Sequence, residues 1–135
     1  ECRKVYNYAL ELGLAFQLQD DLLDSYGTEE ELGKKIGGDI LEGKKTYLML
    51  QAMSRAVEED REILRKTHLD ESLSDDEKIA RVKEVYERYD IQHTVEQQIS
   101  LRFDKALSLL DTLELPSERK EHLRVFAQNL MGRKK

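Results

Sequence analysis

Three aspartates close together in one predicted helix are the first candidates for chemistry. Asp20, Asp21 and Asp24 are spaced so that a helix places them on one face. Like charges at this spacing repel one another by about 0.2–0.5 kcal/mol per pair on an exposed helix. Carboxylate oxygens that converge on one point suit a hard divalent cation, and Mg²⁺ fits best, with waters and phosphate oxygens completing its coordination. The alternative is a solvated acidic face, which the Asp-Asp-x-x-Asp pattern taken alone would favour.

A segment rich in glycine and lysine follows this helix, over residues 33–46. Glycines allow backbone amides to approach an anion closely, and lysines supply point charges for phosphate. Thr46 is a candidate N-cap, and the helix behind it would add donors and the favourable end of a helix dipole. The plain alternative is a surface loop whose lysines offset the acidic balance. A carboxylate face followed by a cationic loop is, however, what a Mg²⁺–diphosphate site requires.

The elements that must position these groups are predicted to be helices. Apolar residues recur every three or four positions along most of the chain. Five of the seven glycines fall within residues 27–43, which predicts a loop there. Val57 and Phe126 are among the residues expected on buried faces. We expect about five helices: from the start to residue 25 or 26, from Thr46 to about residue 66, from a capping box at 74–77 to about residue 89, a long helix that Pro116 ends, and a last helix that Ser117 caps.

Composition and charge argue against several classes of protein. The chain has 135 residues, which is one domain or part of one, and its formal net charge is -6. An acidic chain lacks the basic footprint of nucleic-acid binding, so no nucleic-acid partner is expected. No run of about 18 apolar residues predicts a membrane span. Because Cys2 is the only cysteine and no leader pattern is seen, we expect a cytoplasmic protein.

Other polar residues are expected to be structural. Tyr6, Tyr8, Tyr86 and Tyr89 fall at helical spacings that are typical of a core or an interface. The three histidines have no ligand spacing between them, so we expect no metal site there.

Residues 16–24 resemble the second aspartate-rich motif of the trans-isoprenyl diphosphate synthases, the polyprenyl synthetase family. Residues 33–40 and 43–46 are similar to the loop that follows this motif in the family, in the same order and spacing. The resemblance implies an all-α fold, a helical bundle of the isoprenoid synthase type. That bundle is roughly twice as long as this chain. We therefore expect residues 1–135 to be the C-terminal half of one such domain, without the half that carries the first aspartate-rich motif.

The resemblance also implies a reaction, a Mg²⁺-dependent head-to-tail prenyl transfer. An allylic diphosphate ionises, the double bond of isopentenyl diphosphate attacks the allylic cation, and a proton is lost. By motif position, Asp20, Asp21 and Asp24 would hold one Mg²⁺, with Asp20 the most direct ligand.

Residues around the aspartates would bind the substrate if the resemblance holds. Lys34 and Lys44 would contact the allylic diphosphate. Phe16 and Gln17 would line the pocket beside it, and Asp39 would order the loop. The basic tail resembles one that in some members closes over isopentenyl diphosphate. The family also implies a homodimer.

Two other interpretations stay open at this point. One is a non-catalytic helical subunit that pairs with an active synthase, which the absent half motivates. The other is an acidic helical interaction domain in which the aspartate pattern arose by chance, although it leaves the lysine loop unexplained. For the 135-residue chain alone, we expect no full condensation activity.

Overall fold

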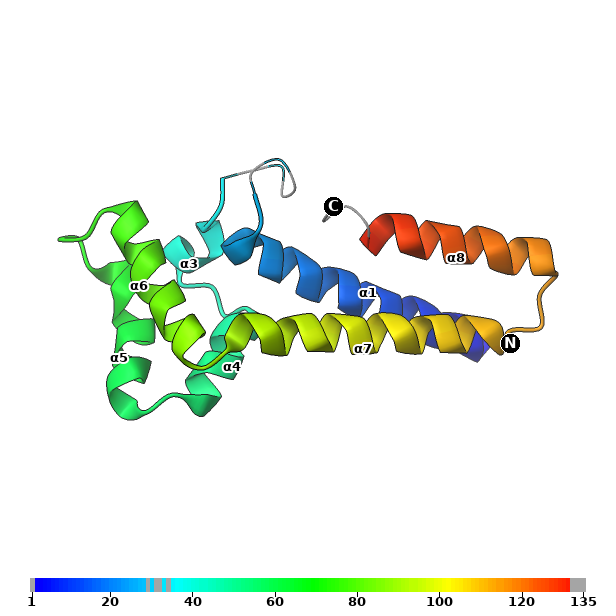
Figure 1. Ribbon diagram of the computed structural model, residues 1–135, viewed down its shortest axis with the longest axis horizontal. Coiled ribbons are helices and arrows are strands. Elements are labelled where there is room, and N and C mark those ends of the chain that lie inside the picture. Colours follow the sequence, from blue (N-terminus) through cyan, green and yellow to red (C-terminus); the bar gives the residue numbers. More distant parts are fainter. Residues whose placement is uncertain (1, 29, 31–32, 34, 132–135) are drawn as a thin grey trace. The chain divides into compact units, whose positions relative to one another are not determined.

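The computed structural model describes residues 2–28, 30, 33 and 35–131. These residues form seven α-helices and one 3₁₀ turn, and none of them is in a β-strand (Figure 1). The all-α prediction is therefore confirmed. The elements are α1 (Cys2–Tyr26), α3 (Gly38–Glu42), α4 (Tyr47–Arg55), α5 (Glu58–Lys66), η1 (Thr67–Leu69), α6 (Asp75–Arg88), α7 (Ile91–Asp111) and α8 (Ser117–Met131).

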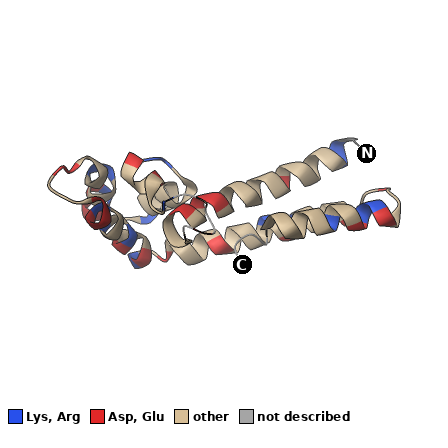
Figure 2. Cartoon of the chain, turned by 90° about the horizontal axis from the view of Figure 1, so that it is seen from above, with Lys and Arg blue, Asp and Glu red and all other residues tan. Residues whose placement is uncertain are grey.

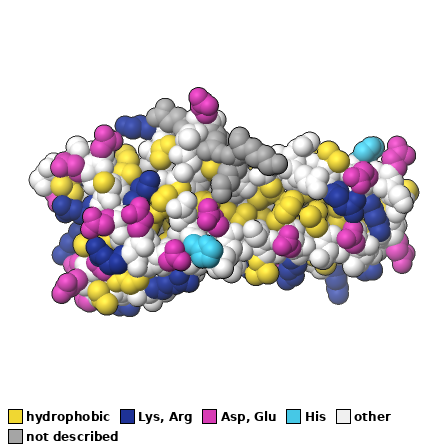
Figure 3. Space-filling view, in the orientation of Figure 1, with side chains coloured by type: hydrophobic (Ala, Val, Ile, Leu, Met, Phe, Trp, Pro, Cys, Tyr) yellow, Lys and Arg dark blue, Asp and Glu magenta, His cyan; other side chains and the backbone are white. Residues whose placement is uncertain are grey.

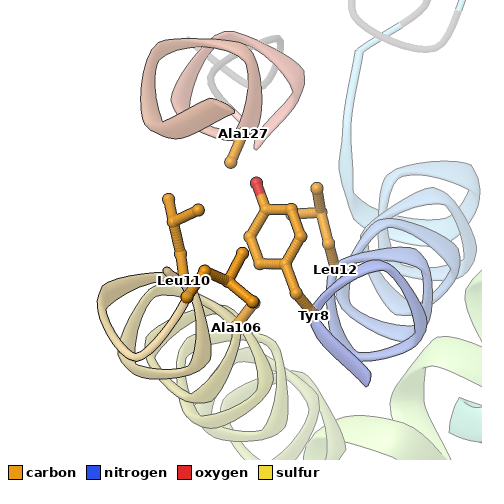
Figure 4. Packing of buried hydrophobic residues seen from close by; sticks show 6 residues of the cluster. Tyr8, Leu12, Ala106, Leu110 and Ala127 are labelled. Atoms are coloured by element: carbon orange, nitrogen blue, oxygen red, sulfur yellow. The ribbon is translucent and has the colours of Figure 1, made fainter. Parts of the chain in front are cut away.

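The chain divides into two compact units, and α1 and α7 contribute residues to both. The first unit comprises residues 1–19 and 96–135. Its core lies where α1, α7 and α8 face one another, and the hydroxyl of Tyr8 points from α1 toward α8 (Figure 4). That hydroxyl donates a 3.0 Å hydrogen bond to the carbonyl of Leu123. The buried members of this core are Tyr8, Leu12, Ala106, Leu110, Leu113 and Ala127.

The second unit comprises residues 20–95 and contains both predicted motifs. Its interior is built from apolar side chains of α1, α4, α6 and α7, which bury the face of each amphipathic helix. Charged residues of both signs lie on α5 and α6 of this unit (Figure 2). On α5, for example, Lys66 and Glu62 form a 2.8 Å ion pair one turn apart. The fully buried apolar residues include Leu22, Leu23, Leu48, Val82, Val85, Tyr86 and Ile91.

The prediction of one helix from Thr46 to about residue 66 is wrong, because the chain breaks it into α4 and α5. Ala56 and Val57 between them have extended backbone, with ψ angles of 149° and 164°. The three acidic residues that follow, Glu58 to Asp60, occupy the first turn of α5. Acidic side chains stabilise the positive end of a helix, so they favour a new start there. Val57 is consequently exposed instead of buried. Together with the short α3, this break explains why there are more than five helices.

Two of the predicted helix caps are confirmed, whereas Ser117, the predicted cap of the last helix, is instead the first residue of α8. Thr46 caps α4, since its hydroxyl accepts a 3.1 Å hydrogen bond from the backbone N–H of Met49. Ser74 and Glu77 form the reciprocal capping box of α6, with hydrogen bonds of 3.1 and 2.8 Å. Asp90 has a positive φ of 55° and separates α6 from α7. The N-terminus of α4, which adjoins the lysine loop, is therefore stabilised by the side chain of Thr46.

Several large apolar side chains of the first unit lie at its surface. Figure 3 shows hydrophobic side chains gathered on this face of the molecule. Phe126 is one of the exposed residues, so its predicted inward position is wrong; Ala127 beside it fills the core position. In the described part of the chain, no helix is long and apolar enough to cross a membrane.

Candidate functional site

The three aspartates of the motif lie at the C-terminal end of α1 and differ in exposure. Asp20 is half-buried, whereas Asp21 is 8% exposed and Asp24 only 1% exposed. Leu22 and Leu23 are fully buried between them, which anchors this turn of the helix in the core of the second unit. Asp20 is therefore the carboxylate most accessible to a ligand.

Asp24 holds the loop that follows α1. Its Oδ2 accepts a 2.9 Å hydrogen bond from the backbone N–H of Asp39, the second residue of α3. Its carbonyl accepts a 2.6 Å hydrogen bond from the N–H of Gly37. Two backbone N–H groups of the loop thus donate to one residue of α1. These two hydrogen bonds fix the segment from Gly37 to Asp39 against the C-terminal end of α1.

Asp21 lies against the N-terminus of α4. Its Oδ2 accepts a 3.3 Å hydrogen bond from the backbone N–H of Tyr47, the first residue of that helix. Unpaired N–H groups and the helix dipole make a helix N-terminus a binding site for negative charge. The sequence pattern predicts that these donors serve a ligand. Here, the N–H of Tyr47 is bound to Asp21 of the protein itself.

Lys44 is a cation of the loop that forms an ion pair with Asp39. Its side chain is exposed, and its Nζ lies 3.9 Å from Oδ1 of Asp39. Its backbone N–H donates a 2.9 Å hydrogen bond to the carbonyl of Asp39. Asp39 therefore contacts Lys44 through both side chain and backbone. Lys34 lies outside the described residues, while the neighbouring Lys35 is described and exposed.

Two glycines of the loop have a packing role that the sequence pattern does not indicate. Gly37 and Gly43 have φ angles of 92° and 70°, a region that residues with a Cβ rarely adopt. A Cβ at Gly37 would lie 2.8 Å from Cγ1 of Ile79, and one at Gly43 would lie 2.7 Å from Cε1 of His68. The N–H of Gly43 is bound to the carbonyl of Ile40 at 3.1 Å. At these two positions, glycine admits a neighbouring side chain and its amide serves the protein instead of an anion.

Phe16 and Gln17 lie on α1, one turn before Asp20 and Asp21. Phe16 is half-buried and Gln17 is exposed, and both belong to the first unit. The basic tail, residues 132–135, lies outside the described residues. Of the predicted site residues, the structure therefore brings together Asp21, Asp24 and Lys44 through the loop, with Asp20 on the adjoining turn of α1.

The helical spacing of Tyr86 predicts a core or an interface position, and this residue is buried in the second unit. Tyr86 lies on α6, and its side chain is 1% exposed. Burial raises the pKa of Tyr86 well above its usual range, and the nearby Asp39 and Asp24 raise it further. Burial also raises the pKa of Tyr26 to about 12. Only the buried hydroxyl distinguishes Tyr86 from a core phenylalanine, and helical spacing gives no sign of it.

The donor atoms at the end of α1 fit Mg²⁺ in their chemistry. Among the described residues, no three acidic, histidine or cysteine side chains are already arranged as metal ligands. One oxygen of Asp21 and one of Asp24 are instead bound to backbone N–H groups. Carboxylate oxygens on consecutive turns are nevertheless the hard donors that Mg²⁺ prefers, and Mg²⁺ usually takes one or two carboxylates plus phosphate oxygens.

Comparison with protein families places this chain beside isoprenoid-forming enzymes. A family model described as polyprenyl synthetase matches residues 1–89. The chain is 33% identical to the geranylgeranyl diphosphate synthase of Saccharolobus solfataricus, over 98% of this chain and 40% of that enzyme. It is 35% identical to the farnesyl pyrophosphate synthase of Rattus norvegicus, over 79% of this chain and 29% of that enzyme. The chain thus spans less than half the length of these relatives.

Solved structures agree with the sequence matches. A crystal structure of a geranylgeranyl pyrophosphate synthase matches 98% of this chain with a TM-score of 0.83 and 36% identity, over 42% of that structure. A second, from Corynebacterium glutamicum and complexed with isoprenyl diphosphate and magnesium, matches 97% of this chain with a TM-score of 0.83 and 32% identity. That match covers 37% of the Corynebacterium glutamicum structure.

Proposed function

Because this chain belongs to the polyprenyl synthetase family, we propose that it is part of a Mg²⁺-dependent prenyltransferase that condenses isopentenyl diphosphate with an allylic diphosphate. Residues 1–135 would be the C-terminal part of one isoprenoid synthase domain, and residues 20–46 its share of the diphosphate site. The observation that carries the proposal is the pair of hydrogen bonds from Asp39 to Asp24 and from Tyr47 to Asp21. They hold the lysine loop against the aspartates, so that carboxylates and a cation lie in one compact unit.

Each residue of the site would have a separate task. Asp20, as the most accessible carboxylate, would be the principal Mg²⁺ ligand, with Asp21 and Asp24 completing the acidic face. Bound Mg²⁺ supplies positive charge that stabilises the diphosphate as it leaves the allylic carbon. Lys44 would neutralise further phosphate charge, and Asp39 orients Lys44 by its backbone and side-chain contacts.

The remaining predicted residues are proposed as substrate contacts. Lys34 would bind the allylic diphosphate together with Lys44, and Phe16 and Gln17 would line the pocket beside it. The solved relative that is complexed with isoprenyl diphosphate and magnesium supports this choice of ligand and metal. We also propose a homodimer, as the family resemblance implies, which the mass of the full-length protein in solution would test.

Thermal unfolding with added ligands tests the proposed site in the chain as it stands. We expect Mg²⁺ with geranyl diphosphate to raise the melting temperature, while either one alone has a small effect. Ligand at 100 times its dissociation constant stabilises by about 2.7 kcal/mol, which is roughly 10 °C for a domain of this size. Asp20→Asn should abolish the shift. Asp104→Asn, which changes an exposed carboxylate on α7, should retain it. An equal shift in both variants would contradict the proposed site.

Catalysis by the chain alone provides a separate test. Since the chain spans 40% of the Saccharolobus solfataricus enzyme, we propose that it does not carry out the full condensation by itself. Radiolabelled isopentenyl diphosphate incubated with geranyl diphosphate, Mg²⁺ and the purified chain should give no elongated product. If the wild-type chain forms elongated product and the Asp20→Asn variant at the same concentration does not, this proposal is wrong.

A further inference from the structure

His68 is a half-buried polar side chain outside the proposed site, and it lies against the lysine loop. It is the middle residue of η1, the 3₁₀ turn that follows α5. The hydroxyl of Thr67 donates a 2.5 Å hydrogen bond to the carbonyl of Ile63 on α5. Nζ of Lys78, on α6, donates a 3.1 Å hydrogen bond to the carbonyl of His68. The backbone of this turn is therefore fixed to both α5 and α6.

The imidazole of His68 packs on Gly43, the residue at which α3 ends. Apart from the chain neighbours of Gly43, the three atoms nearest to a Cβ at this position would all belong to the ring of His68, with Cδ2 at 2.5 Å and Cε1 at 2.7 Å. The ring thus occupies the place that a side chain of residue 43 would take. Glycine has no Cβ to restrict its backbone, so φ values of either sign are open to it. Contact with the ring supplies a restraint that glycine itself lacks.

The conformation of Gly43 decides where Lys44 lies. With φ at 70°, the N–H of Gly43 donates to the carbonyl of Ile40 at 3.1 Å. The N–H of Lys44 donates to the carbonyl of Asp39 at 2.9 Å. Two such bonds commonly end a helix where a glycine is left-handed. The same turn places Nζ of Lys44 3.9 Å from Oδ1 of Asp39. A change of φ at Gly43 would therefore break the backbone bonds and displace Lys44.

We propose that His68 is a positioning residue whose ring holds Gly43 in its left-handed conformation and thereby keeps Lys44 in the place where it binds the diphosphate of the substrate. Its relevance to binding rests on the proposed function. Its hold on Gly43 is a property of the folded chain and is measurable without any ligand. His68 does not touch the substrate in this proposal, because it acts through Lys44.

His93 provides a matched control for substitution of His68. It lies on α7 within the second unit, and its side chain is exposed. His68→Ala removes an imidazole that packs on the loop, whereas His93→Ala removes an exposed one from a helix. A difference between these two variants therefore reports on the contact with Gly43 and not on the loss of a histidine as such.

Hydrogen exchange of the two amides at the end of α3 is the first measurement. Relative to amides in the buried part of α6, the N–H groups of Gly43 and Lys44 should exchange about two- to fivefold faster in His68→Ala than in the wild type, because Gly43 regains backbone freedom. In His93→Ala, both should exchange as in the wild type. Equal exchange of these amides in the two variants would overturn the proposal.

The affinity for geranyl diphosphate is the second measurement, and a loss of overall stability would not change it while the chain stays folded. Isothermal titration calorimetry at a fixed Mg²⁺ concentration measures the dissociation constant. His68→Ala should raise this constant several-fold, and His93→Ala should leave it unchanged. An unchanged dissociation constant in His68→Ala would show that His68 does not position a group that binds the ligand.

A double substitution tests whether His68 acts through Lys44. Lys44→Met removes the charge, keeps a side chain of similar length, and should weaken binding at least as much as His68→Ala. Adding His68→Ala to Lys44→Met should then cause no further loss, because the group that His68 positions is already gone. Additive losses, or a smaller loss in Lys44→Met than in His68→Ala, would overturn the proposal. If the wild type binds no geranyl diphosphate, the proposed function is contradicted, and hydrogen exchange still decides the role of His68.

Discussion

The backbone N–H of Asp39 donates a 2.9 Å hydrogen bond to Oδ2 of Asp24, and this bond joins residues 15 positions apart in the chain. It fixes α3 to the end of α1, with a second bond from Gly37 to the carbonyl of Asp24. The last aspartate of the motif therefore has a structural role besides the one proposed for it in metal binding. These two roles can be separated, because binding a metal ion requires the negative charge of Asp24 whereas accepting the hydrogen bond requires only an oxygen atom.

Replacing Asp24 by alanine and by asparagine should have different effects on stability. Asp24→Ala removes the acceptor for the buried N–H of Asp39, and we expect the free energy of unfolding to fall by about 1–3 kcal/mol. Asp24→Asn keeps an oxygen at this position and should recover most of that loss. Both variants should lose the thermal shift produced by Mg²⁺ and geranyl diphosphate. Urea unfolding measures the first effect and thermal unfolding with ligand the second; equal destabilisation by the two substitutions would refute the structural role.

Gly43→Ala should destabilise the lysine loop for two reasons, backbone strain and steric overlap with His68. Gly33→Ala can separate them, because only the backbone strain applies at Gly33. The φ angle of Gly43 is 70°, and an added Cβ would overlap the imidazole of His68. Gly33 has a similar φ of 82°, but a Cβ there would meet nothing within 4 Å. Gly33→Ala should therefore show only the backbone strain, about 1 kcal/mol, and Gly43→Ala clearly more.

The contribution of His68 follows from a double substitution. His68→Ala in the Gly43→Ala background should recover the part of the loss that steric overlap causes and leave the part that positive φ causes. Urea titrations should give the free energies of unfolding of the wild type, the two single variants and the double variant. If His68→Ala recovers nothing, the contact between Gly43 and His68 does not explain the glycine.

The elements could be predicted from sequence where the signal is local. Thr46 and Ser74 are polar caps directly before apolar periodicity, and both caps are present. The break at Ala56 and Val57 is not predicted because neither residue is a glycine or proline, and the acidic run behind them would also fit the solvated face of a continuing helix. A start signal inside a continuous helical pattern is ambiguous until the tertiary structure decides.

The site was harder to predict than the helices, because its contacts connect distant residues. The spacing of the aspartates places them on one helix face, but it cannot show that Tyr47 and Asp39 would supply donors to two of them. The glycine content of the loop predicts an anion-binding loop. Gly37, however, is needed because a Cβ there would overlap the side chain of Ile79.

The first unit should become less stable in acid, because protonation of Glu11 removes its ion pairs with Arg102 and Lys105. Burial alone would raise the pKa of this carboxyl, but hydrogen bonds and charges of Arg102 and Lys105 outweigh burial and hold it below the usual 4.5. A carboxyl with a lowered folded-state pKa stabilises the fold above its unfolded-state pKa, and this stabilisation disappears as pH falls through the folded value. Glu11→Gln should therefore be less stable than the wild type near neutral pH, and the difference should vanish below the folded-state pKa. Urea unfolding across this range measures it, and a difference that does not change with pH would contradict the assignment.

Tyr8 offers a test of the first unit that should leave the proposed site unaffected. Its hydroxyl donates to the carbonyl of Leu123, which joins α1 to α8. Tyr8→Phe should lower the free energy of unfolding by about 0.5–1.5 kcal/mol, the usual contribution of one hydrogen bond. Tyr6, two residues earlier, is 65% exposed, so Tyr6→Phe should change stability by less than about 0.5 kcal/mol. Because Asp21, Asp24 and Lys44 all lie in the second unit, neither variant should change the Mg²⁺ concentration for half of the thermal shift. A large change in that concentration with Tyr8→Phe would show that the packing of α8 contributes to the ligand site.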